Sequence, residues 1–468
     1  MSLLQNVGRL VILRILVRLV FLGSMLYFTR QLTPNVLGSY FYFEALLGLT
    51  SFIAAFGVGG ATEKYVSGND NQSRWYSAGL VLTVGLGVVA AAVALLLNTV
   101  LEFLNQAFLA YFFIGLIADR VVSFYKCIFR AELQAAMAGA VDFLRTVTFI
   151  ILAVVLTSFE FGATSLVLAA VVGRLVMIPM NVFYTTSQFS LPSVAELREL
   201  IDFSKYYMIS VGGMRVFYLA DIVLIGALLT TADVGRYEVA WRLIFAGMII
   251  NNVVSNTVFS YISSASTEGD FESIQRDVAE SIGYLTILPL ATIVGSLVVG
   301  EELLVVLFTT EYLAHPWLLP LLSFGFLFQS IYYLFNRTLF AIDEPVQSFY
   351  ATIVAIAANL SLNLVLIPVY GVLGAATATT LSFAVASGVF YWFLSKSMVV
   401  SVPWTTLSVQ AAAAVLMGAV LVGVTWVVAT DGIIATVMLV VFGSIVYLGL
   451  LLTRPNTRKL LLDVVREI

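Results

Sequence analysis

The sequence predicts an all-α polytopic membrane protein, and three observations support this prediction. Hydrophobic residues make up 61% of the chain and charged residues only 11%, whereas soluble domains contain about 45–50% and about 25%. The mean hydropathy is +1.02. Apolar runs of span length recur along the whole chain, because a helix needs about 20 mostly apolar residues to cross a bilayer. No stretch between these runs is long enough to fold into a soluble domain.

The apolar runs divide into about fourteen expected membrane-spanning helices. They are separated by breaks that contain proline or several polar residues, and such breaks end helices. Examples of these breaks are the segments 33–35, 67–74 and 343–345. The expected spans are residues 8–29, 38–60, 75–97, 107–125, 140–158, 163–187, 206–228, 237–262, 282–299, 315–334, 346–368, 371–394, 405–428 and 432–452.

Lysine and arginine in the loops orient the expected spans, because cytoplasmic loops of membrane proteins carry an excess of both. An even number of spans puts both termini on one side. The loops of that side hold most of the basic residues, whereas the opposite loops hold only Arg30 and Arg236. We therefore expect a multi-pass protein of the cell membrane with both termini in the cytoplasm.

A repeat sets the expected division of the chain. Residues 32–40 (LTPNVLGSY) align with residues 229–237 (LTTADVGRY). Residues 161–170 align with residues 370–379 at a slightly larger offset. Each repeat holds six spans, so both enter the membrane from the same side, and such parallel lobes usually enclose a central cavity. The expected parts are an N-lobe at 1–190, a cytoplasmic amphipathic linker helix at 191–205, a C-lobe at 206–396, two further spans at 397–453 and a cytoplasmic tail at 454–468.

The linker between the lobes carries the signature of a helix that begins at a capped N-terminus. Ser193 is followed three residues later by Glu196, which is the spacing of a capping box. Leu197, Leu200 and Ile201 share one helical face. This pattern predicts an amphipathic helix on the inner leaflet.

The two halves of the chain resemble a known family. The run 359–383, NLSLNLVLIPVYGVLGAATATTLSF, resembles the C-terminal half of Wzx-like polysaccharide biosynthesis flippases of the MOP superfamily. The stretch FTRQLTPNVLGSY at 28–40, followed by FGVGGATEKYV at 56–66, is similar to the family's opening helices. The resemblance covers about residues 8–400.

This resemblance implies a function. It implies that the chain moves a polyprenyl-(pyro)phosphate-linked oligosaccharide from the cytoplasmic to the outer leaflet by alternating access, for assembly of surface polysaccharide or glycoprotein glycan. The partners that it implies are the lipid-linked oligosaccharide, membrane lipids and other membrane proteins of glycan assembly.

Several arginines lie inside the expected spans, where a charged side chain costs about 2.5–3.5 kcal/mol near the bilayer centre. Each must reach water, a headgroup or a partner. Asp142 with Arg145, and Glu238 with Arg242, have spacings that bring side chains together on a helix. These pairs are either structural or functional. The secondary candidates for a cavity lining are Arg120, Arg145, Arg174 and Arg242.

Arg14 and Arg18 are one helical turn apart with no acidic residue in their expected helix. Two like charges on one face are unfavourable unless an anion binds between them. Arg215 is the repeat counterpart of Arg18. We therefore expect Arg14, Arg18 and Arg215 to bind the phosphate or pyrophosphate of the substrate, because the guanidinium fork suits phosphate oxygens. The alternative is a static core in which such arginines pair with Asp221, Glu44 or Asp142.

The source of energy is expected to be an ion gradient, the membrane potential or removal of product, because the sequence has no ATP-binding motif. Asp221 either carries H⁺ or Na⁺ for coupling or balances Arg215, and Glu44 is the second candidate for coupling. The chain has one cysteine and one histidine, which excludes a Cys-based or multi-histidine metal site. No cofactor and no nucleic acid is expected.

Other function classes remain as alternatives. A MATE-like exporter of small cationic molecules, coupled to H⁺ or Na⁺, needs an acidic cavity, whereas arginines outnumber acids inside the expected spans. A membrane glycosyltransferase or polymerase usually carries sizeable outer loops, and the outer loops here are short. A scaffold of a glycan-assembly complex needs no charged cavity. The sequence thus favours a flippase that is not an enzyme.

Overall fold

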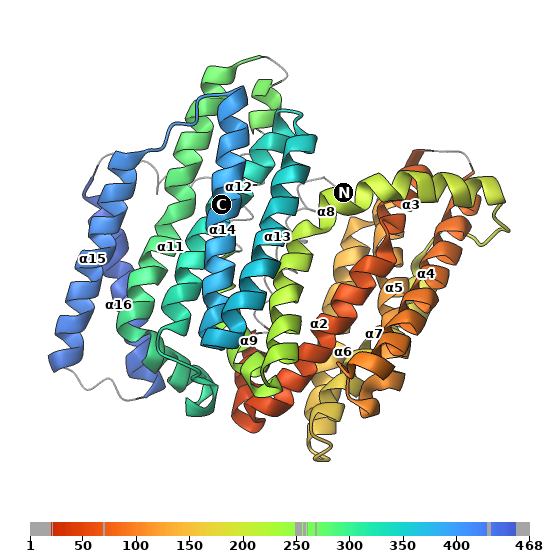
Figure 1. Cartoon of the computed structure of the whole chain (residues 1–468), viewed down its shortest axis with the longest axis horizontal. Helices are drawn as coiled ribbons and strands as arrows, with labels where there is room; N and C mark the ends of the chain where they lie inside the picture. Colours follow the sequence, from red (N-terminus) through yellow and green to blue (C-terminus); the bar gives the residue numbers. More distant parts are fainter. Residues whose placement is uncertain are drawn as a thin grey trace. The chain divides into compact units, whose positions relative to one another are not determined.

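The computed structural model describes residues 20, 22–68, 71–248, 255, 259, 261–266, 269–427 and 432–454, without the side chains of 205–215, and the statements below concern this part of the chain. The described residues form α-helices joined by short turns and contain no strand (Figure 1). Eleven helices are long and apolar enough to cross a membrane. The prediction of an all-α polytopic membrane protein is therefore confirmed.

The chain divides into two compact units, residues 1–227 and 228–468. The helices of the first unit are α2 (Pro34–Ala55), α3 (Val58–Gly68), α4 (Gln72–Leu101), α5 (Leu109–Ala131), α6 (Ala135–Thr157), α7 (Ala163–Tyr184) and α8 (Val194–Leu228). The helices of the second unit are α9 (Thr231–Phe245), α11 (Phe271–Phe308), α12 (Leu318–Ala341), α13 (Pro345–Tyr370), α14 (Val372–Ser397), α15 (Trp404–Val427) and α16 (Ile433–Leu452).

Three of the fourteen expected spans do not match any of the eleven helices that are long and apolar enough to cross a membrane. Most of the span expected at 8–29 lies outside the described residues, and so does part of the span expected at 237–262. The span expected at 206–228 coincides with the end of α8, and only its part Val216–Leu228, which is apolar, has described side chains. The count of fourteen spans therefore stays a prediction.

The span expected at 38–60 is divided between two helices in the structure. The sequence predicted a single helix over 38–60, but α2 ends at Ala55 and α3 begins at Val58. Phe56 and Gly57 both have positive φ, 43° and 75°. A left-handed residue ends a helix, and glycine adopts this conformation at little cost. The apolar run continues through the break, so hydropathy alone did not reveal it.

The matched stretches of the proposed repeat have the same local structure in each unit. Gly162 precedes α7 with φ 59° and ψ −137°, and Gly371 precedes α14 with φ 60° and ψ −136°. Thr33 and Thr230 both occupy the N-cap position, of α2 and α9 respectively. These positions agree with the repeat read from the sequence. The arrangement of two lobes around a cavity stays a prediction.

The capping box expected before α8 is formed. The Ser193 amide donates a hydrogen bond to the Glu196 carboxylate (2.6 Å), and the Glu196 amide donates one to Ser193 Oγ (3.3 Å). The helix continues as one element to Leu228, so the linker and the next expected span are parts of the same helix.

The start of α8 packs on helices of its own unit. In Figure 1 it lies across the ends of α3 and α4. Leu200 is buried in a cluster with Ala61 of α3 and Ala78 of α4, and Leu197 packs against this cluster. Ile201 stays exposed. Most of the apolar face therefore contacts protein, and a position of this helix on the inner leaflet stays a prediction.

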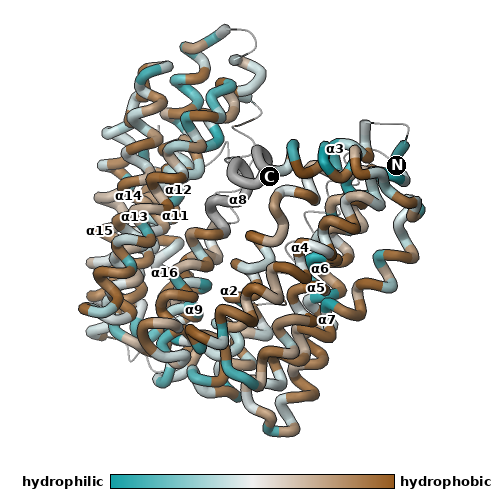
Figure 2. Tube along the Cα trace, turned by 45° about the vertical axis from the view of Figure 1, so that its right-hand side comes forward, coloured by the Kyte–Doolittle hydropathy of each residue, from teal (hydrophilic) through white to brown (hydrophobic). Residues whose placement is uncertain are grey.

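The last two helices are held to α11 in the second unit by side-chain hydrogen bonds. Gln410 of α15 donates to the carbonyl oxygen of Gly283 (2.9 Å), and Tyr447 of α16 donates to that of Ile287 (3.0 Å). Both acceptors lie shortly before Pro289, a proline inside α11. Hydrophobic residues cover most of the length of the helices in both units (Figure 2), as expected for surfaces that face lipid.

Candidate functional site

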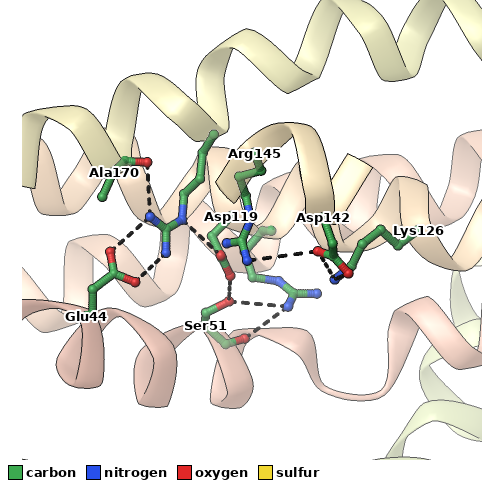
Figure 3. Close-up of polar contacts among 9 residues, drawn as sticks. Glu44, Ser51, Asp119, Lys126, Asp142, Arg145 and Ala170 are labelled. Atoms are coloured by element: carbon green, nitrogen blue, oxygen red, sulfur yellow. Dashed lines mark hydrogen bonds and ion pairs between the residues drawn. The ribbon is translucent and has the colours of Figure 1, made fainter. Parts of the chain in front are cut away.

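A network of charged side chains is buried between α2, α5 and α7 in the first unit (Figure 3). Arg174 of α7 donates two hydrogen bonds to the Glu44 carboxylate of α2, at 2.6 and 3.0 Å, and a third to Asp119 of α5 at 3.1 Å. The side chain of Arg174 is 6% exposed, that of Asp119 10% and that of Glu44 26%. One guanidinium thus binds two carboxylates from two other helices.

Ser51 extends this network toward a second arginine. Its hydroxyl donates to Asp119 (2.7 Å), and Arg120 donates to the Ser51 carbonyl oxygen (3.2 Å) and hydroxyl (3.4 Å). The network of Glu44, Ser51, Asp119, Arg120 and Arg174 is called here the Arg174 network. Its two arginines and two carboxylates balance in charge, which is the condition for keeping ions in a low-dielectric interior.

A second group of charges lies between α5 and α6. Lys126 Nζ lies 3.0 and 3.2 Å from the two carboxylate oxygens of Asp142, and an Arg145 Nη2 lies 3.9 Å from one of them. All three side chains are partly exposed, by 27% for Lys126, 42% for Asp142 and 34% for Arg145. In this Lys126–Asp142–Arg145 cluster, two cations share one carboxylate, so one positive charge is in excess.

Helix geometry explains why these groups meet. Asp119 and Lys126 are seven residues apart on α5, which places them on one face two turns from each other. At Gly173 of α7, an added Cβ would lie 3.5 Å from the Arg145 carbonyl oxygen and 3.6 Å from the Phe149 nitrogen of α6. The small residue lets α6 and α7 approach closely. This contact fixes α6, and with it Arg145, beside the Arg174 network.

The second unit holds the ion pair expected within one helix. Arg242 pairs with Glu238, one turn earlier on α9. The Glu238 side chain is buried and that of Arg242 is partly exposed. The structure therefore places the secondary candidates in three different settings: Arg120 and Arg174 in the Arg174 network, Arg145 in the cluster on α6, and Arg242 in a pair on α9.

The expected phosphate site cannot be compared with the structure. Arg14 and Arg18 lie outside the described residues, as does the side chain of Arg215. Of the candidates for ion coupling, Asp221 is buried, and Glu44 is bound by Arg174. In the structure, the partner of Glu44 is therefore Arg174, whereas Glu44 was expected from the sequence only as a coupling group or as a partner of Arg14, Arg18 or Arg215.

Sequence reasoning missed three contacts. It assigned neither Glu44 nor Asp119 to Arg174, and it placed Lys126 in a loop rather than opposite Asp142. The contact of Lys126 with Asp142 could have been found, because α5 and α6 are joined by only three residues, 132–134. Two antiparallel helices with so short a connection bring residues at similar distances from the turn together.

Comparisons with known proteins agree on one family. A family model described as "Polysaccharide biosynthesis protein" matches residues 27–315. The "Probable low-salt glycan biosynthesis flippase Agl15" of Haloferax volcanii is 26% identical over 440 residues, which cover 94% of this chain and 93% of that protein. The "Probable flippase AglR" of the same organism is 24% identical and covers 86% of each chain.

Solved structures share the fold. The lipid II flippase MurJ in its inward closed conformation superposes with a TM-score of 0.78 at 14% identity, over 95% of this chain and 98% of that one. An inward-facing multidrug resistance MATE transporter of the MOP superfamily superposes with a TM-score of 0.66 at 16% identity, over 84% and 98%. At these identities the likeness concerns the fold alone.

Proposed function

We propose, because the chain belongs to the polysaccharide biosynthesis protein family, that it is a flippase for a polyprenyl-phosphate- or pyrophosphate-linked oligosaccharide. It takes this lipid from the cytoplasmic leaflet and releases it in the outer leaflet by alternating access, without covalent chemistry. Two relatives that cover most of the chain are named as flippases, which supports this function. The setting is the cell membrane, with both termini in the cytoplasm.

The observation that carries the substrate class is the excess of positive charge inside the first unit. The Arg174 network balances its own charges, whereas Asp142 is the one carboxylate that Lys126 and Arg145 share among the residues that the structure describes. Unbalanced cations within membrane spans are costly. An anionic phosphate offsets that cost, and a cationic drug increases it. This sign of charge favours the flippase over the MATE-like exporter.

The proposed binding site for the phosphate is the set predicted from the sequence, Arg14, Arg18 and Arg215. Arginine suits this role because its planar fork donates two parallel hydrogen bonds to phosphate oxygens. Glu44 and Asp221 stay the proposed groups for coupling to H⁺ or Na⁺. Membrane lipids and other membrane proteins of glycan assembly are the further proposed partners.

The test is a flipping assay in proteoliposomes with a fluorescent polyprenyl-pyrophosphate saccharide. Wild type is expected to move the lipid, and Arg18→Ala and Arg215→Ala are each expected to slow it at least about tenfold, since charged hydrogen bonds contribute about 1.5–3 kcal/mol. The control is Lys396→Ala, which removes a cation at the end of α14 that lies over the Trp392 ring.

Each outcome of this assay has a defined meaning. Normal flipping by both arginine variants would exclude the proposed phosphate site while leaving the flippase function intact. A wild type that moves no lipid but exports a cationic dye would replace the flippase with the MATE-like alternative.

A further inference from the structure

We infer that Lys126 and Arg145 form a second phosphate-binding subsite, and that Asp142 occupies this subsite with its own carboxylate in the absence of substrate. The ligand is the phosphate or pyrophosphate group of the carrier lipid. This inference rests on the proposed function and assigns part of the binding to residues outside the expected phosphate site.

The contacts of the cluster resemble those that an oxyanion would make. Lys126 Nζ lies within 3.2 Å of both Asp142 oxygens, so one ammonium group already binds two oxygens of one anion. Arg145 lies 3.9 Å from the same carboxylate, beyond hydrogen-bond length. Within the part of the chain that the structure describes, its guanidinium makes no hydrogen bond. A phosphate group has more oxygens than a carboxylate and more negative charge, so it can accept a hydrogen bond from Arg145 as well as from Lys126.

The depth of the cluster makes an unused guanidinium costly. Arg145 follows Ala135, the first residue of α6, by a distance of about 15 Å at 1.5 Å per residue. This is roughly half the thickness of the hydrocarbon core. An arginine at that depth requires an anion or water. Since a third of its side chain is exposed, a ligand can reach it.

The second unit shows that the helices pack without these charges. The turns at Leu133 and Asp343 have the same backbone conformation, with φ of 58° and 60°, and their alignment matches Lys126 with Asn336. In the alignment set by Leu133 and Asp343, Asp142 and Arg145 match Thr352 and Ala355. In the alignment set by Gly162 and Gly371, they match Ala351 and Val354. All four residues are uncharged. Because the repeat counterparts are neutral, the fold itself does not require the cluster.

The Arg174 network provides a contrast in the same unit. Arg174 is 6% exposed and its donors are directed at Glu44, Asp119 and the Ala170 carbonyl oxygen. Its positive charge is already matched by two carboxylates, and four of its five N–H donors are used. Of these two groups of charges, the Lys126–Asp142–Arg145 cluster is the one with both accessible cations and an incomplete set of anionic partners.

The test measures binding rather than flipping. The purified full chain in phosphatidylcholine nanodiscs is titrated with a fluorescent short-chain polyprenyl phosphate. Asp142→Asn is expected to tighten binding about tenfold by removing the competing carboxylate, and Lys126→Gln and Arg145→Gln to weaken it about tenfold, as expected for charge-assisted hydrogen bonds. The control is Arg130→Gln, which removes a cation of the same helix that has its own carboxylate, Glu63.

A change of affinity in the opposite direction, or none, for Asp142→Asn overturns the subsite. Asp142→Ala provides the same test with a different side chain, and melting temperatures identify any variant that is not folded. Equal competition by phosphatidylglycerol or by inorganic pyrophosphate would also overturn it, because the subsite would then bind any anionic headgroup or phosphate. If the wild type binds and flips the carrier lipid and the variants bind it equally well, only the subsite is rejected. If the wild type neither binds nor flips the carrier lipid, the proposed function is rejected.

Discussion

At the scale of single residues, the Arg174 network raises the question of why a membrane protein buries four charges. The repeat counterparts of Glu44, Asp119 and Arg174 are Trp241, Gln329 and Phe383. The second unit therefore has aromatic and neutral side chains at the positions that correspond to these charges. Buried ion pairs are often no more stable than well-packed apolar residues. The charges of the first unit are therefore better explained by function or by specificity of packing than by stability.

This comparison predicts an asymmetry between single and combined substitutions. Arg174→Leu alone leaves Glu44 and Asp119 without their cation, and is expected to lower stability by about 3 kcal/mol, since removing one partner of a buried pair costs about 3–5 kcal/mol. The combination of Arg174→Leu and Glu44→Leu, which leaves Asp119 and Arg120 as equal and opposite charges, is expected to recover most of that loss. The measurement is thermal unfolding of the purified variants in detergent. A double variant less stable than the single one would contradict the argument.

At the scale of elements, the sequence predicted correctly those features that depend on residues only a few positions apart. The capping box at Ser193 and Glu196 depends on a spacing of three residues, and the structure confirms it. Gly162 and Gly371, which the repeat aligns, also have the same positive φ before α7 and α14, a conformation that glycine adopts at little cost. The break at Phe56 was missed, because Phe56 is as apolar as its neighbours and its left-handed conformation does not change the hydropathy of the run.

The cap also yields a prediction for α8. Ser193→Ala removes the acceptor of the Glu196 amide and is expected to weaken the first turn by about 1 kcal/mol. Hydrogen exchange of the amides in the first turn of α8 should accelerate roughly fivefold, since 1.4 kcal/mol corresponds to a factor of ten. Ser158→Ala, which removes a side-chain hydrogen bond at the end of α6, serves as the control. Unchanged exchange would mean that packing on α3 and α4 holds this turn by itself.

At the scale of the whole molecule, composition and hydropathy were enough to predict the fold class, and motifs were enough to predict the family. Both predictions are confirmed. The pairing of Arg174 with Glu44 and Asp119 could not be predicted in this way. These residues lie 130 and 55 positions from Arg174 in the sequence. Which of them it meets depends on how each helix is rotated, and uniformly apolar helices carry little periodicity to reveal that rotation.

Orientation is the property of the whole molecule that most needs a direct measurement. The sequence has a single cysteine, Cys127, so a Cys127→Ala background allows labelling at chosen sites. Leu133 and Glu160 lie at opposite ends of α6 and both have a φ of 58°, which makes them a matched pair. In intact cells, a membrane-impermeant maleimide is expected to label Glu160→Cys, and to label Leu133→Cys only after permeabilisation, because basic loops stay in the cytoplasm.

The same experiment tests whether the repeat is parallel. Asp343 is the counterpart of Leu133 in the second unit and has nearly the same φ, 60°. If each repeat holds an even number of spans, Asp343→Cys must behave like Leu133→Cys and stay protected in intact cells. Labelling of Asp343→Cys from outside, with Leu133→Cys protected, would require an odd number of spans between them. The repeat would then be inverted, the count of fourteen would be wrong, and the two termini would lie on opposite sides of the membrane.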